Sequence, residues 1–94
     1  MGVIFDIFYH EAVVKDGISK LPSFWKAKIK TAIENKLTER PELFGKPLRA
    51  SLRGYRKLRV GDYRVIFRIE KMAVKIFAIQ HRSVIYKMID NRIL

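Results

Sequence analysis

The chain has 94 residues, of which 49% are hydrophobic, and its twenty Lys and Arg residues against nine Asp and Glu residues give a formal net charge of +11. This length fits a single domain over residues 1–94, and the apolar content excludes a disordered basic tail. The chain has no cysteine, which excludes disulfides and thiolate metal sites, and no apolar run approaches the roughly 20 residues of a membrane span, so we expect a cytoplasmic protein without a signal peptide.

The predicted elements begin with a strand over residues 3–9, whose β-branched and aromatic residues suggest that both of its faces are covered. Apolar residues at roughly helical spacing predict a short first helix over residues 10–21. Pro22 begins a second helix, which Pro41 ends. Its apolar stripe consists of Trp25, Ile29, Ala32, Ile33 and Leu37.

The second half of the chain is expected to be mostly β-structure. Residues 41–54 contain two Pro and two Gly residues and are expected to form a loop. A hairpin follows, then a strand over residues 74–79 and a terminal amphipathic helix over residues 84–94. The predicted fold is α+β, with a small antiparallel β-sheet, two N-terminal helices packed on it and a short C-terminal helix.

The hairpin can be predicted in register. Gly61 and Asp62 separate two alternating segments, which is typical of a two-residue β-hairpin loop. With this loop the opposed pairs are Val60 and Tyr63, Arg59 and Arg64, Leu58 and Val65, and Lys57 and Ile66.

Alternation along the strands then assigns two faces. The predicted core face carries Leu58, Val60, Tyr63, Val65 and Phe67, and the opposite, cationic face carries Tyr55, Lys57, Arg59, Arg64, Ile66 and Arg68. Like charges placed directly opposite destabilise a sheet, so a face that collects them is expected to meet an anion. Nucleic acid, an anionic membrane surface and an acidic protein are all compatible with this charge, as is a merely solvated face.

The residues available for chemistry are few. With two histidines, no cysteine and scattered acids, the sequence offers no transition-metal cluster and no carboxylate pair for Mg²⁺, so we expect neither a metal nor a cofactor. His81 follows the strand over residues 74–79, beside Arg82, and Tyr86 comes five residues later. Such a pair could protonate a leaving oxygen and stabilise charge on a phosphoryl group, although a lone histidine at a strand end is more often structural.

Three segments together resemble a known family. They are Phe44-Gly-Lys-Pro-Leu48, Leu58-Arg-Val-Gly-Asp-Tyr-Arg-Val-Ile-Phe67 and His81-Arg-Ser-Val-Ile-Tyr86, and in order and spacing they are similar to the signatures of the RelE/ParE superfamily of bacterial and archaeal toxins. The resemblance covers nearly the whole chain. It implies a small toxin that is neutralised by a cognate acidic antitoxin in a hetero-oligomeric complex.

Members of the RelE branch cut messenger RNA in the ribosomal decoding site without a metal, using the ribose 2′-hydroxyl as nucleophile. The resemblance thus implies a ribosome-dependent endoribonuclease, with the ribosome and messenger RNA as partners. Its catalytic residues would be Arg64, Arg82, His81, Tyr86, Arg59 and Lys57, and its RNA-binding residues Arg53, Tyr55, Arg56 and Arg68.

Within this assignment the identities of the general base and general acid stay open. The chain has Tyr55 and Lys57 where some members carry two lysines, and Gln80 where some carry an arginine. Two other functions also stay open: a ParE-type inhibitor of DNA gyrase, and a basic RNA-binding module without activity.

Overall fold

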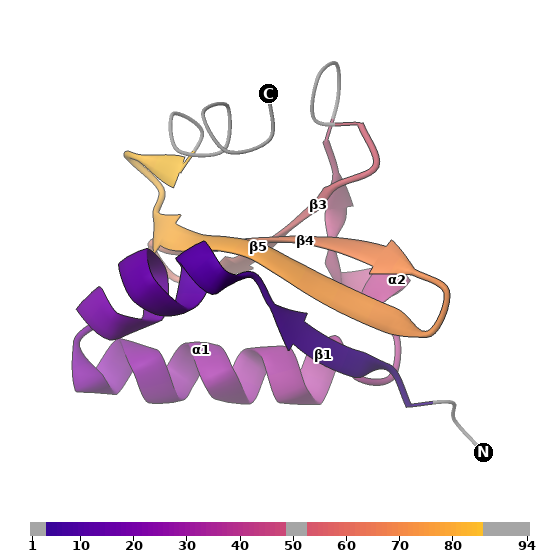
Figure 1. Ribbon diagram of the computed structural model, residues 1–94, viewed down its shortest axis with the longest axis horizontal. Coiled ribbons are helices and arrows are strands. Elements are labelled where there is room, and N and C mark those ends of the chain that lie inside the picture. The colour runs from indigo at the N-terminus through magenta and orange to yellow at the C-terminus, as the bar shows by residue number, and fades with distance from the viewer. Residues whose placement is uncertain (1–3, 49–52, 86–94) are drawn as a thin grey trace.

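The computed structural model, shown in Figure 1, describes residues 4–48 and 53–85. Its described part has the α+β fold that the sequence predicts, with helices packed on a five-stranded sheet of order β1-β5-β4-β3-β2. The strands are β1 (Asp6–Tyr9), β2 (Lys46–Pro47), β3 (Arg56–Val60), β4 (Tyr63–Glu70) and β5 (Ala73–His81). None of the described helices is long and apolar enough to span a membrane.

The position of β1 differs from the prediction. It lies at the edge of the sheet, and 53% of Phe8 is exposed, so the expectation that both faces of this strand are covered is wrong. It also runs parallel to β5, which makes the sheet mixed and not purely antiparallel. Local sequence patterns predict the pairing of strands that a short turn connects. The pairing of β1 with β5 was not predictable in this way, because most of the chain lies between the two strands.

The first predicted helix is irregular. It consists of a π-helical turn, η1 (Val13–Gly17), followed by a 3₁₀ turn, η2 (Ile18–Lys20). Gly17 is buried against β5, where a Cβ atom would lie 2.9 Å from the carbonyl oxygen of Ile79. This close approach requires glycine, which is also the residue that weakens a regular helix.

The second helix, α1 (Ser23–Lys36), begins directly after Pro22, as predicted. Ile29, Ile33 and the following Leu37 are buried, and Trp25 and Ala32 pack beside them, so the apolar stripe is confirmed. The prediction that the helix continues to Pro41 is wrong. The Thr38 carbonyl already accepts a hydrogen bond from the Phe5 N–H at 2.6 Å, and Pro41 instead begins the short helix α2 (Pro41–Phe44), a position that proline favours.

The β3–β4 hairpin has the predicted register in all four pairs. Gly61 has φ of +60°, and since Asp62 has no positive φ, the turn is of the type II′ that favours glycine first. The ring of Trp25 lies on Gly61, so close that a Cβ atom there would come within 2.4 Å of it. The turn is therefore packed against α1.

The core lies between α1 and the face of the sheet that carries Leu58, Val60, Val65 and Phe67, which confirms the predicted core face. The opposite face is less open than predicted, because Ile66 and Ala78 are buried there together with Ile85, with Leu48 and Tyr55 packed against them. Phe77 is an extra residue in β5, since Ile76 pairs with Phe67 while Ala78 pairs with Ile66. This bulge places Phe77 and Ala78 on the same face.

Strand β5 extends the strand predicted over residues 74–79 and ends at His81. The helix predicted over residues 84–94 lies outside the described residues from position 86 onward.

Candidate functional site

Of the six predicted catalytic residues, the five that the structure describes lie on β3, on β4 and at the end of β5, around the β3–β4 turn. Arg59 pairs with Arg64, and Arg64 in turn pairs with Gln80 on β5. The Arg82 backbone N–H donates to the Asp62 carbonyl at 2.8 Å, which fixes the end of β5 beside the turn. We call this region, comprising Lys57, Arg59, Arg64, His81 and Arg82, the hairpin-tip site.

The Arg64 side chain is held against its own turn. Its Nη1 donates to the carbonyl oxygen of Gly61 at 2.9 Å and to that of Tyr63 at 3.0 Å. A guanidinium group has five N–H donors, and these two bonds engage the donors of Nη1 alone. The arrangement orients the planar group, whose remaining edge has the geometry that binds phosphate oxygens in pairs.

Three arginines of the hairpin-tip site carry positive charges that no described carboxylate pairs with. Among the described residues no carboxylate lies within ion-pair distance of Arg59, Arg64 or Arg82. Lys46 of β2 pairs with Lys57 of β3, which adds a second like-charge pair to the same face. Such pairs are unfavourable unless an anion compensates them.

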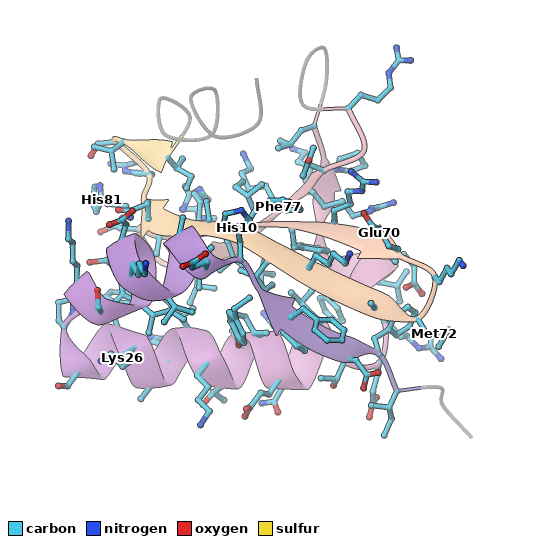
Figure 2. All side chains as sticks on the ribbon, viewed as in Figure 1. His10, Lys26, Glu70, Met72, Phe77 and His81 are labelled. Atoms are coloured by element: carbon cyan, nitrogen blue, oxygen red, sulfur yellow. The ribbon has the colours of Figure 1, made fainter. Side chains whose placement is uncertain are left out.

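His81 lies on the other face of the sheet from Arg64. It pairs with Tyr63 across the β4–β5 ladder, and its ring lies edge-on to the Tyr63 ring at 5.7 Å. The Tyr63 ring is 5.1 Å from that of Trp25, so one row of rings runs from α1 to His81, which Figure 2 marks at the end of β5. His81 Nδ1 accepts the Ser83 N–H at 3.2 Å, and the neutral ring therefore carries its proton on Nε2.

Two of the predicted RNA-binding residues lie away from the tip. The Arg68 guanidinium is 5.8 Å from the Tyr55 ring, and it pairs with Glu70 at 2.8 Å. Glu70 also pairs with Lys75 at 2.9 Å, and Figure 2 shows it at the opposite end of the sheet from His81. The hydrogen bond from Lys75 is the main cause that lowers the pKa of Glu70. Desolvation opposes it, and the charges of Arg68 and Lys75 add to the lowering.

The other two predicted RNA-binding residues, Arg56 and Arg53, also lie outside the hairpin-tip site. Arg56 points to the helix-covered side, where its Nη1 donates to the Gly45 carbonyl at 2.9 Å. Arg53 is exposed in the turn before β3. Tyr86, predicted as catalytic, lies outside the described residues.

Three neighbours of the site are not among the predicted site residues, although the comparison with the family already draws attention to Gln80. Gln80, opposite Arg64, donates to the Asp16 carbonyl at 2.9 Å and joins the site to η1. Lys46 lies next to the site because β2 pairs with β3. Trp25 lies next to it because α1 packs against the β3–β4 turn. The one sequence signal for Trp25 was its place at the start of an apolar stripe. The described residues contain no group of three His, Cys, Asp or Glu side chains that could hold a metal.

A family model for the ParE toxin of the type II toxin–antitoxin system parDE matches residues 8–86. The chain is also 34% identical to Toxin RelE of Mycobacterium tuberculosis over 85 residues, which is 85% of this chain and 88% of that protein. The chain belongs to the RelE/ParE superfamily of toxins.

Solved structures of this superfamily share the fold. The toxin–antitoxin complex RelBE2 from Mycobacterium tuberculosis contains a chain with a TM-score of 0.79 and 30% identity, matched over 86% of this chain and 94% of that one. A chain of the RelB–RelE complex from Methanococcus jannaschii has a TM-score of 0.67 over 84% of this chain and 94% of that one, at 23% identity. The resemblance inferred from the three sequence segments is thus confirmed at the level of family and fold.

Proposed function

We propose that this RelE/ParE toxin is a ribosome-dependent endoribonuclease that cuts messenger RNA through its own 2′-hydroxyl group. The observation that carries the proposal is the hairpin-tip site. It combines Arg64, which its own turn orients, with Arg59 and Arg82, and described carboxylates pair with none of the three. His81 lies in the ladder pair next to that of Arg64, at the end of β5 and on the other face of the sheet. An acid-poor cluster of this kind suits a reaction in which negative charge builds up on a phosphoryl group.

In the proposed reaction the 2′-oxygen attacks the adjacent phosphorus while the bond from phosphorus to the 5′-oxygen breaks. The products are a 2′,3′-cyclic phosphate and a free 5′-hydroxyl group. Arg59 and Arg64 bind the non-bridging oxygens, whose charge grows in the transition state, and Lys57 contributes further positive charge from the same face.

The leaving 5′-oxygen needs a proton, and the 2′-hydroxyl loses its proton to a water molecule. The imidazolium form of His81 can give its Nε2 proton to the 5′-oxygen and keep its Nδ1 proton, which the Ser83 hydroxyl accepts. Arg82 lies beside His81 and stabilises the negative charge on the phosphoryl group. Arginines stay protonated at neutral pH and are therefore poor bases. Since no strong base stands out among the described tip residues, the ribosome is proposed to supply the geometry that makes the 2′-hydroxyl reactive.

We propose a cognate acidic antitoxin as the second partner. The support comes from the related toxins, which were solved as RelB–RelE complexes, and from the net charge of +11. An antitoxin that covers the cationic face would block access of a phosphate to the hairpin-tip site.

Primer extension on cellular messenger RNA after brief induction tests the proposal. We expect new 5′ ends within translated codons, and none in untranslated transcripts. Cuts that ignore translation, or no cuts in arrested cells, would contradict it.

Inhibition of DNA gyrase is the second candidate function, and the match to a ParE family model favours it. A supercoiling assay with purified gyrase separates the two candidates. Inhibition by the wild-type protein and equally by Arg64→Ala would assign the chain to the ParE type, because a binding toxin does not require charge stabilisation at that residue.

A further inference from the structure

A groove of about 710 Å³ runs between α1 and the β3–β4 turn, next to the hairpin-tip site. Its lining includes small residues, among them Ala27, Ala32 and Gly61. Lys28 and Lys36 of α1 line one side and Arg59 of β3 lines the other. Among the described residues that line the groove, none is acidic.

The basic residues are spread along the groove. Lys28 and Lys36 lie eight positions apart on α1, which corresponds to about 12 Å along the helix axis. Thr31 and Asn35 lie between them, one helical turn apart, and also line the groove. They supply polar groups suited to ribose hydroxyls, as the lysines supply charge suited to phosphates.

One end of the groove carries an exposed aromatic ring. Phe24 is 66% exposed, and Lys28 Nζ lies 5.4 Å from the centre of its ring. An exposed ring beside a cation is a platform on which an unpaired base can stack. The groove also shares Arg59 with the hairpin-tip site, so the two are adjacent.

We infer that this groove binds the single-stranded RNA segment that adjoins the scissile phosphate, with its backbone along Lys28, Lys36 and Arg59 and a base on Phe24. The inference rests on the proposed function, since it extends the path of the same RNA strand. An acidic protein segment is the rival occupant, but it would make no use of an exposed ring at the end of a row of cations.

Binding of a fluorescent, uncleavable 2′-O-methyl RNA to the full-length protein, measured by anisotropy over a range of salt concentrations, tests the inference. The variant Lys28→Gln/Lys36→Gln should lower the slope of log K against log salt by about 1.4, because two phosphate contacts are lost. The matched control is Lys26→Gln/Lys30→Gln, which removes the same charge from lysines that line a different cavity, on the other side of α1. The control should keep the wild-type slope.

Phe24→Ala tests the stacking. It should weaken binding by about tenfold, whereas Phe8→Ala, which removes the exposed ring of β1, should not. Circular dichroism of each variant confirms that it is folded.

Equal losses in the groove and control variants would overturn the inference, because net charge alone would then explain binding. Unchanged RNA binding, with weaker binding of an acidic peptide to the groove variant, would also overturn it and assign the groove to a protein partner. These binding results do not depend on catalysis. If the protein leaves no cuts in cells, the proposed function fails while RNA binding in the groove can still be observed.

Discussion

At the scale of single residues, the environment of each arginine distinguishes its role better than its place in the sequence. Arg64 and Arg68 are both basic residues of β4 and both were predicted to face RNA. Arg64 is oriented by two backbone carbonyls and has no described carboxylate partner, whereas Arg68 is paired with Glu70. Only the first arrangement leaves a full positive charge for a phosphate.

We therefore predict that Arg64→Ala and Arg82→Ala each lower the cleavage rate by about 100-fold, because charge stabilisation in the transition state is lost. Arg68→Ala is the matched control and should lower the rate by less than about tenfold, since its charge is already paired. The rate is measured on programmed ribosomes, and thermal unfolding should show that each substitution costs about 1 kcal/mol or less. An Arg64→Ala protein that is folded and fully active would contradict the catalytic assignment.

At the scale of elements, the β3–β4 hairpin was predictable because Gly61 and Asp62 fix its loop and the loop fixes its register. The grouping of Arg59 and Arg64 followed from that register alone. The face of His81, the pairing of Lys46 with Lys57 and the contact of Trp25 with Gly61 were not predictable, because each depends on elements distant in sequence.

The burial of Ile66 shows the same limit of local patterns. Alternation placed it correctly on the cationic face, but Ala78 and Ile85 bury it there. Ala78 reaches this position through the bulge at Phe77, which strict alternation along β5 does not predict.

The packing of the turn predicts different costs for two glycine substitutions. Gly61→Ala should destabilise the protein by about 2–4 kcal/mol, because it combines a left-handed backbone with a clash against Trp25. Gly54→Ala is the control, with φ of +94° but open space around it, and should cost only about 1–2 kcal/mol. Denaturant unfolding measures both, and equal costs would show that the contact between the turn and α1 is unimportant.

The β4–β5 ladder predicts a pH-dependent contribution from Glu70. Its pKa is lowered in the folded protein, so its pairing with Lys75 and Arg68 stabilises the fold above the ordinary pKa of a glutamate, about 4.3. That stabilisation is lost as the pH falls through the lowered pKa. Glu70→Gln should therefore be less stable than the wild type at neutral pH and equal to it in acid, as measured by thermal unfolding over a pH series. A difference that persists in acid would rule out the ion pairs as its cause.

At the scale of the whole molecule, the fold separates stability from function. The face of the sheet under α1 carries the main core, and the opposite face carries cations around a small second cluster. The net charge of +11 then acts at long range on any anionic partner.

Association with an acidic antitoxin should accordingly be fast at low salt. The association rate should fall by at least tenfold as the ionic strength rises to about 1 M, because charges are then screened beyond roughly 3 Å. Stopped-flow fluorescence measures the association rate. A rate independent of salt would indicate that the antitoxin recognises apolar surface and not the cationic face.

The central claim is that the chain supplies charge stabilisation while the ribosome supplies substrate geometry. It is tested most directly by comparing cleavage of one messenger RNA by the purified protein, free in solution and bound to a programmed ribosome with an open decoding site. We predict efficient cleavage at the decoding site and cleavage of naked RNA that is slower by at least about 1,000-fold, since positioning alone can contribute several kcal/mol. Equal rates on free and ribosome-bound RNA would contradict the account.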